Sequence, residues 1–152
     1  MTPPELRFAF EIAVDVAAPL DLGQTQAGHR RVVPIAGGVV SGPKLQGRIL
    51  TGGADWQILR PDGTADLDAR YTIEATDGGL ISAVNRGVRH GPADVLARLN
   101  RGERVDPGAY YFRSAASFET GTAAHTWLTR AVIIGVGERY PDKVIIRFWE
   151  LL

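Results

Sequence analysis

The segment that decides the fold is Phe8-Ala9-Phe10-Glu11-Ile12-Ala13-Val14-Asp15-Val16, near the start of the chain. Large apolar side chains occupy every second position, and small or acidic side chains stand between them. This alternation is typical of a β-strand with one buried face. It predicts a strand over residues 8–16 and a mainly β protein around it.

Turn-forming residues divide the rest of the chain into similar segments. The turn signals are Gly37-Gly38, Ser41-Gly42-Pro43, Gly52-Gly53, Pro61-Asp62-Gly63, Asp77-Gly78-Gly79 and Pro141-Asp142-Lys143. The segments between them predict strands at about residues 29–40, 45–50, 55–60, 69–76, 80–89, 109–117, 126–138 and 144–151. Two hairpins are expected, one around Asp77-Gly78-Gly79 and one around Tyr140-Pro141-Asp142.

One segment, residues 92–101, has helical character. Pro92 stands near its start and Gly102 follows its end, which is the asymmetry that α-helices favour. Val95, Leu96 and Leu99 supply a narrow apolar face. We expect one short helix there, or an irregular loop with a single helical turn.

The number and order of the strands predict the architecture. About nine strands, nearly all in hairpin order, favour a single antiparallel β-barrel, and a two-sheet sandwich is the alternative. Closure removes the exposed edges that an open sheet of this size would keep. The length of 152 residues predicts one domain over residues 1–152.

The composition limits the classes of partner that the protein is expected to bind. Lys+Arg and Asp+Glu both number 17, so the formal net charge is zero and no basic stripe is visible. This argues against nucleic acid or an anionic membrane as a partner, and it is compatible with a homodimer because colloidal repulsion is weak. The apolar stretches, such as residues 131–136, are too short to span a bilayer. Residues 1–7 lack the pattern of a signal peptide, so a cytoplasmic location is expected.

The sequence predicts neither a metal nor an organic cofactor. There is no cysteine, which removes disulfides and thiolate chemistry. His29, His90 and His125 stand far apart and lack the spacing of metal ligands. Gly135-Val136-Gly137 lies inside a predicted strand and opens no helix, so it does not match a dinucleotide fingerprint.

The first candidate site is Gly52-Gly53-Ala54-Asp55-Trp56. In a structural interpretation, Asp55 accepts backbone hydrogen bonds at a turn and Trp56 anchors a strand in the core. In a functional interpretation, the double glycine lets the chain approach a ligand closely while Asp55 faces it. A regular strand points the two side chains to opposite faces, so a bulge is needed for both to line one cavity.

The second candidate is Arg70, which precedes Tyr71 at the start of a predicted strand. In the predicted strand Arg70 lies on the same face as Thr72 and Glu74, which is the polar face. This argues for an outward Arg70 side chain. The structural alternative is a salt bridge that contributes little to stability. The functional alternative is a guanidinium that holds a substrate carboxylate or enolate.

A third group follows later in the chain and consists of Tyr110, Tyr111, Phe112, Arg113, Phe118 and Glu119. A carboxylate beside aromatic rings has its charged form disfavoured, which suits a general acid or base at neutral pH. Glu119 also stands beside Thr120-Gly121-Thr122, where a solvated loop residue is the structural alternative. Trp127 is expected to be a core or pocket-wall residue.

The chain resembles the mostly bacterial proteins grouped as domain-of-unknown-function family 3237. The residues that carry the resemblance extend over nearly the whole chain and are Arg31 to Gly38, Ser41 to Gly47, Gly52 to Gln57, Asp68 to Tyr71, Tyr111 to Arg113, Phe118-Glu119 and Trp127-Leu128. The resemblance implies a compact, lipocalin-like β-barrel with a cavity. It implies no particular activity.

Together these observations predict a barrel that binds a small organic molecule. We expect a cofactor-independent acid/base enzyme of the isomerase, tautomerase or hydratase type, acting on a carboxylated or phenolic metabolite. Asp55 or Glu119 would transfer the proton, and Arg70 or Arg113 would hold the anionic group. The walls would be formed by Trp56, Tyr71, Tyr111, Phe112 and Trp127. The alternatives are a non-catalytic carrier of lipocalin type and a structural or interaction module.

Overall fold

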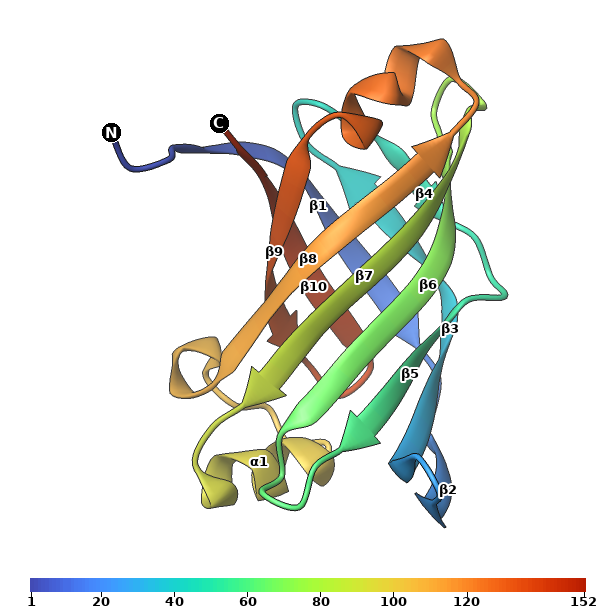
Figure 1. Ribbon diagram of the computed structural model, residues 1–152. Coiled ribbons are helices and arrows are strands. Elements are labelled where there is room, and N and C mark those ends of the chain that lie inside the picture. The colour runs from blue at the N-terminus through green and yellow to red at the C-terminus, as the bar shows by residue number, and fades with distance from the viewer.

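Eight antiparallel strands close into a ring in the computed structural model, which describes residues 1–152 (Figure 1). In order around the ring they are β1 (Leu6–Val16), β10 (Lys143–Leu151), β9 (Val132–Arg139), β8 (Tyr111–Thr120), β7 (Leu80–His90), β6 (Ala65–Ala75), β4 (Gly47–Ile49) and β3 (Gly28–Ser41). Two strands lie outside this order: β5 (Ala54–Leu59) also bridges β3 and β6, and β2 (Leu20–Thr25) pairs with β3 alone. The predicted mainly β fold and antiparallel barrel are confirmed.

Strand β1, with the alternating sequence quoted above, closes the barrel. Its Ile12 lies opposite Ile146 of β10 at one edge and opposite Val40 of β3 at the other. Alternate side chains of β1, including Phe10 and Ile12, are fully buried in the interior. The alternation therefore encodes both the burial of one face and the pairing that removes the sheet edges.

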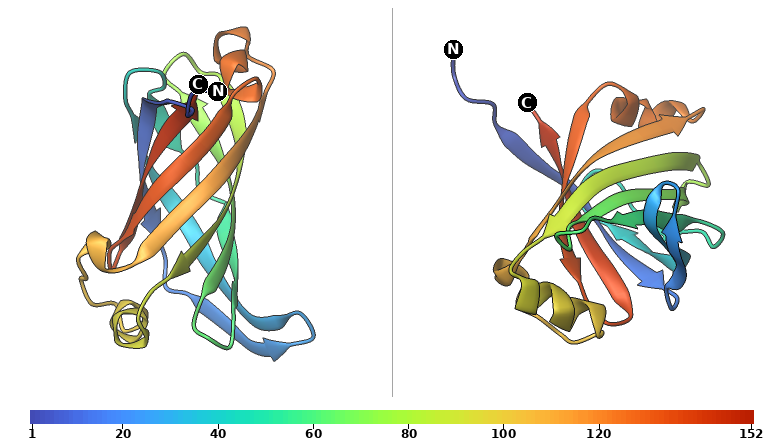
Figure 2. Two further views of the ribbon diagram at one scale, coloured as in Figure 1. Left: turned by 60° about the vertical axis from the view of Figure 1, so that its left-hand side comes forward. Right: turned by 60° about the horizontal axis from the view of Figure 1, so that its bottom comes forward.

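Helical segments lie at opposite ends of the barrel (Figures 1 and 2). The predicted helix is α1 (Ala93–Asn100), which buries Val95, Leu96 and Leu99. Two 3₁₀ segments, η1 (Pro107–Ala109) and η2 (Ala123–Thr129), flank β8. None of these helices has both the length and the apolar character needed to cross a membrane.

The structure differs from the prediction at two places. Strand β2 was not predicted because its side chains are mostly exposed and show no buried alternation. Residues 126–131 were predicted as strand, but η2 ends only at Thr129. The hydroxyls of Thr126 and Thr129 donate to the carbonyl oxygens of Ala123 and Thr126, at 2.9 and 2.7 Å. Such local bonds compete with a strand ladder and favour the helical turn.

Aromatic packing fills the part of the interior near η2. The ring centroids of Phe10 and Phe148 lie 4.8 Å apart, and those of Phe10 and Phe118 lie 6.0 Å apart. Leu128 of η2 is buried in the same core. This packing leaves the cavity described below in the remaining part of the barrel.

Candidate functional site

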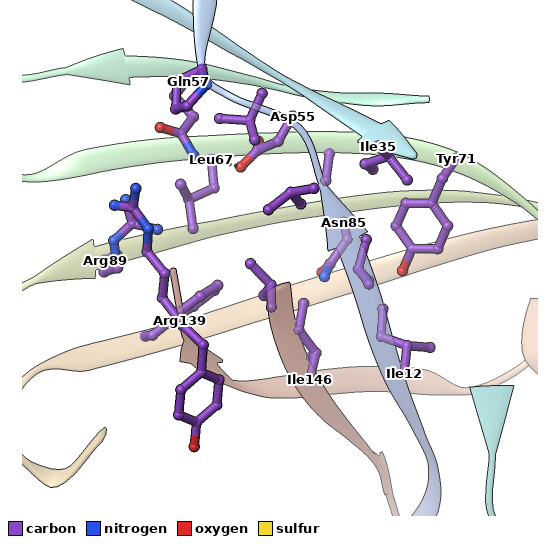
Figure 3. A pocket seen from close by; sticks show the side chains of 18 of the residues that line it. Ile12, Ile35, Asp55, Gln57, Leu67, Tyr71, Asn85, Arg89, Arg139 and Ile146 are labelled. Atoms are coloured by element: carbon purple, nitrogen blue, oxygen red, sulfur yellow. Dashed lines mark hydrogen bonds between the residues drawn. The ribbon is translucent and has the colours of Figure 1, made fainter. Parts of the chain in front are cut away.

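The barrel encloses a cavity of about 300 Å³ (Figure 3). Most of its wall is apolar and includes Ile12, Val14, Ile35, Leu67, Phe112 and Ile146. The β1–β2 connection (residues 17–19) and the β9–β10 turn (residues 140–142) also line it. The backbone N–H of Val16 donates to the carbonyl oxygen of Asp142 at 3.2 Å and ties these two segments together. Concave, mainly apolar spaces of this size are typical small-molecule sites.

Asp55 brings a carboxyl group to this cavity from strand β5. It lies opposite Val33 of β3 and Ala69 of β6, in a row of inward-facing positions. Gly53, which directly precedes β5, allows β5 to lie this close to β6. A Cβ on Gly53 would meet Tyr71 Cβ at 2.9 Å, so only glycine lets the two chains approach this closely. Gly53 thus packs against β6, whereas a Cβ on Gly52 would meet no atom within 4 Å, and Gly52 has a positive φ of 107° that suits a turn.

Hydrogen bonds hold both carboxylate oxygens of Asp55. Oδ2 accepts from Gln57 Nε2 at 2.8 Å, and Oδ1 accepts from the backbone N–H of Asp68 at 2.9 Å. Gln57 Oε1 in turn accepts from Arg31 Nε and Nη2 at 3.0 and 2.7 Å. The carboxylate is therefore fixed in direction by the series Arg31, Gln57, Asp55.

The surroundings of Asp55 change its acidity. Burial raises the pKa of the Asp55 carboxyl above its ordinary value, and the hydrogen bonds from Gln57 and Asp68 oppose that rise. A carboxylate whose pKa is raised is a stronger base than an exposed aspartate, and in a cavity it can exchange a proton with a bound molecule.

Two guanidinium groups, Arg89 of β7 and Arg139 of β9, line the same cavity. Burial, together with the nearby charges of Arg139 and Arg31, lowers the pKa of Arg89 to about 9. Burial likewise lowers the pKa of Arg139 to about 10. Both groups therefore keep their charge at neutral pH. Neither guanidinium donates a hydrogen bond or forms an ion pair within the chain, and Arg89 lies over the Phe112 ring at 5.6 Å.

Four buried side-chain polar atoms of the protein have no hydrogen-bond partner: Tyr71 Oη, Asn85 Oδ1, Ser114 Oγ and Arg139 Nη1. All four residues line the cavity. Buried polar atoms are nearly always paired in folded proteins, because an unpaired one costs free energy. All four therefore bring unused hydrogen-bonding capacity to one interior space.

The sequence-predicted residues on β5 and β6 divide between the two faces of the barrel. Asp55 and Tyr71 line the cavity. Trp56 is 39% exposed, and the Arg70 side chain is 52% exposed and pairs with Asp68 at 3.3 Å. The expectation that Arg70 reaches the interior is corrected, because strict alternation along β6 directs Tyr71 inward and Arg70 outward.

Strand β8 divides its predicted residues in the same way. Phe112 lines the cavity, whereas Tyr111, Arg113 and Glu119 are exposed on the outer face. The expectation that Glu119 serves the cavity as an acid/base group is therefore corrected by the same alternation. Trp127 of η2 also lies outside the cavity lining, with Lys44 Nζ 3.8 Å above its ring.

Sequence reasoning missed the polar interior residues Arg31, Gln57, Asn85, Arg89 and Arg139. A signal was present for two of them. Ile81 and Ala83 are apolar and buried on β7, and the same alternation continues to Asn85 and Arg89. Polar residues that continue an apolar face mark positions inside a barrel.

The histidines occupy separate surface sites. His29 and His125 pair with Asp21 and Asp77, both at 2.8 Å, and His90 lies 5.3 Å from the ring of Tyr111. No group of three or more His, Cys, Asp or Glu side chains is arranged to hold a metal ion.

A distant fungal relative shares the fold. The chain is 23% identical over 150 residues to "Hydroalkoxylation enzyme phnH" of Penicillium herquei, covering 99% of this chain and 85% of that protein. The crystal structure of an enzyme from Penicillium herquei superposes with a TM-score of 0.74 at 21% identity, covering 100% and 97% of the two chains.

Bacterial relatives are closer. The UPF0311 protein RPA1785 of Rhodopseudomonas palustris is 39% identical over 153 residues and covers 100% of both chains, and its crystal structure superposes with a TM-score of 0.94. A beta-barrel like protein from Acinetobacter baumannii is 40% identical with a TM-score of 0.84, covering 99% of each chain. The model of the family described as "Protein of unknown function (DUF3237)" matches residues 4–151. The chain belongs to this family.

Proposed function

We propose that this protein binds a small carboxylated or phenolic molecule in its barrel and catalyses a proton transfer on it without metal or organic cofactor. The observation that carries the proposal is the carboxyl group of Asp55, held over an apolar cavity by Gln57 and the Asp68 backbone N–H. Asp55 is the general acid/base of this proposal. Tyr71 and Phe112 are wall residues, and Arg89 and Arg139 hold the anionic group.

The environment of Asp55 supports this role. Its pKa is raised by burial, which makes the carboxylate a stronger base than an exposed aspartate. Both oxygens keep fixed hydrogen bonds, so the carboxylate does not need to reorient during the reaction. A positioned acid/base group of this kind contributes about 10²- to 10⁴-fold to a proton-transfer rate.

The fungal relative supports the reaction class. Hydroalkoxylation, in its name, adds a hydroxyl group across a carbon–carbon double bond. The O–H bond and the π bond of the C=C double bond break, an O–C bond and a C–H bond form, and no oxidant or reductant is consumed. Such an addition needs a group that takes the proton from oxygen and a group that delivers one to carbon. Isomerisation, tautomerisation and hydration need the same two proton transfers.

Proton exchange on a carboxylated phenol tests the proposal. The probe is 4-hydroxyphenylpyruvate in D₂O, in which NMR follows the exchange of the hydrogens next to the carbonyl. We expect the wild type to accelerate this exchange and Asp55→Asn to lose at least about 100-fold of the acceleration. A wild type that binds the probe but exchanges no faster than Asp55→Asn would contradict the enzyme proposal. The carrier alternative, which the mainly apolar wall favours, would then hold.

A further inference from the structure

We propose that the cavity recognises its ligand at two separated points, an anionic oxygen at Arg89 and Arg139 and a neutral hydroxyl at Tyr71 and Asn85. The ligand class is therefore a hydroxylated carboxylate with a compact apolar body, such as one or two fused rings. This inference rests on the proposed function only in that both concern the same cavity.

The balance of charge supports the anionic point. The guanidinium groups of Arg31, Arg89 and Arg139 act on one another and on Asp55, and the exposed Asp21 acts on Arg31. Asp142 also lines the cavity but is exposed on the β9–β10 turn. Arg31 has a partner in Gln57, but Arg89 and Arg139 have none within the chain. A buried unpaired cation costs free energy, and an anionic ligand removes that cost.

The geometry of a guanidinium pair selects the kind of anion. Each guanidinium presents a planar fork of N–H donors that matches the two oxygens of a carboxylate. Arg89 is 4% exposed and is held against the Phe112 ring, so its fork has little freedom to turn away. Arg139 keeps a fully buried, unpartnered Nη1. The pair is thus prepared to bind a carboxylate end.

The second point has a different chemistry. Tyr71 Oη and Asn85 Oδ1 are buried without partners, and both groups are neutral. Burial raises the pKa of the Tyr71 hydroxyl, so it remains a neutral donor and acceptor. Figure 3 shows these two side chains away from the arginines, across the pocket. In this proposal a ligand hydroxyl accepts from Tyr71 and donates to Asn85.

The strand register gives the separation. Arg89 and Asn85 stand four positions apart on the inward face of β7, so their Cα atoms are about 13 Å apart along the strand. Asp55 lies in the row of Asn85, because both pair with Ala69 of β6. The proton-transfer group is therefore level with the hydroxyl end, and the carboxylate is the end by which the ligand is held.

A fluorescent probe of matching shape tests the two points separately. The probe is 6-hydroxy-2-naphthoate, compared with 2-naphthoate, which lacks the hydroxyl, and 6-hydroxy-2-naphthamide, which lacks the charge. Binding is followed by the fluorescence of the probe. We expect the amide to bind about 10- to 100-fold more weakly, as for a lost hydrogen bond to a charged group, and 2-naphthoate about 3- to 10-fold more weakly.

Variants assign each preference to its residues. Arg139→Gln is expected to remove the preference for carboxylate over amide, and Tyr71→Phe to remove the preference for the hydroxyl. Arg86→Gln, an exposed position on the outer face of the same strand as Arg89, is the control that keeps both preferences. Circular dichroism checks folding, and Arg139→Met, which also removes the charge, replaces the glutamine variant if that variant unfolds.

The inference is overturned if the amide binds as tightly as the carboxylate, or if Tyr71→Phe leaves the ratio of 6-hydroxy-2-naphthoate to 2-naphthoate affinity unchanged. Absence of saturable binding up to about 1 mM overturns it as well. Inorganic phosphate that displaces the probe at equal affinity would reduce the site to a simple anion site. The affinity ratios are measured at equilibrium and do not depend on proton exchange. The two-point inference can therefore fail while the proposed enzyme activity holds, and the reverse.

Discussion

The side-chain amide of Gln57 donates a hydrogen bond to Asp55 Oδ2 at 2.8 Å. Its carbonyl oxygen is at the same time occupied by two hydrogen bonds from Arg31, at 3.0 and 2.7 Å. Because both contacts to Arg31 use the oxygen, the amide can present only its nitrogen to Asp55. Gln57 therefore positions the proposed acid/base group and also satisfies a buried guanidinium.

Replacement of Gln57 by leucine removes both contacts. The hydrogen bond favours the charged carboxylate, so its loss is expected to raise the pKa of Asp55 further. Arg31 is left buried without a partner, which is expected to reduce the free energy of unfolding by about 1–3 kcal/mol. Carbon-13 NMR titration of the Asp55 carboxyl and urea denaturation measure the two effects. Gln24→Leu, at an exposed position, is the control; an unchanged Asp55 pKa in Gln57→Leu would refute the role.

Asp55 imposes a pH dependence on stability. Its pKa is higher in the folded than in the unfolded chain, so the folded state binds more protons between the two values. The contribution is fully present below the unfolded pKa and is lost as pH rises through the folded pKa. The free energy of unfolding of the wild type, minus that of Asp55→Asn, is therefore expected to fall as pH rises from the unfolded to the folded pKa of Asp55.

Asp66 is the matched control for this experiment. Its ion pair with Arg60 lowers its pKa. The stability contributed by Asp66 is therefore present above the unfolded pKa and lost as pH falls. Denaturation of wild type, Asp55→Asn and Asp66→Asn across acid pH should give difference curves of opposite slope. Parallel curves would contradict a raised Asp55 pKa.

The unpaired arginines predict a conflict between stability and binding. Arg139→Met replaces a desolvated charge by an apolar side chain of similar length, and we expect it to raise the free energy of unfolding of the ligand-free protein by about 1 kcal/mol. The same variant is expected to bind 6-hydroxy-2-naphthoate more weakly. Thermal denaturation with and without the probe measures both. A loss of ligand-free stability with unchanged affinity would assign Arg139 a structural role instead.

Gly137 of β9 packs against the ring of Phe112, which lines the cavity. A Cβ at this position would meet the Phe112 ring at 2.6–2.7 Å, so Gly137→Ala must push the ring aside. Overpacking of this kind is expected to cost about 1–3 kcal/mol of stability. At Gly121 no atom lies within 4 Å of the added Cβ, and Gly121→Ala is expected to be near neutral. Equal melting temperatures for the two variants would refute the tight contact.

The strand pattern was predictable where burial is one-sided. The alternation in residues 8–16 and the turn at Asp77-Gly78-Gly79 predict β1 and the β6–β7 hairpin because each strand has one buried face. Strand β2 escaped prediction, since it lies outside the ring and buries almost nothing. Residues 126–131 read as strand because hydroxyl-to-backbone bonds are not encoded in the apolar pattern.

The candidate site was predictable only in part. Asp55 follows a double glycine, which marks it as a candidate in the sequence. Because side chains alternate along β5, Asp55 faces inward and the next residue, Trp56, faces outward. The arginine partners were misjudged, because Arg70 and Arg113 stand beside aromatic residues in sequence, while Arg89 and Arg139 reach the cavity from β7 and β9, the two strands that flank β8. Contacts between β7 and β9 depend on the ring order of the strands, which local sequence does not specify.

The most direct test of the account is the rate of solvent-deuterium exchange into 4-hydroxyphenylpyruvate, measured by NMR for wild type, Asp55→Asn and Glu119→Gln at equal probe occupancy. Both carboxyl groups were candidates from the sequence, but only Asp55 lines the cavity, and Glu119 is exposed. The account predicts that Asp55→Asn loses the acceleration and that Glu119→Gln keeps the wild-type rate. Full acceleration in Asp55→Asn, or its loss in Glu119→Gln, would contradict it.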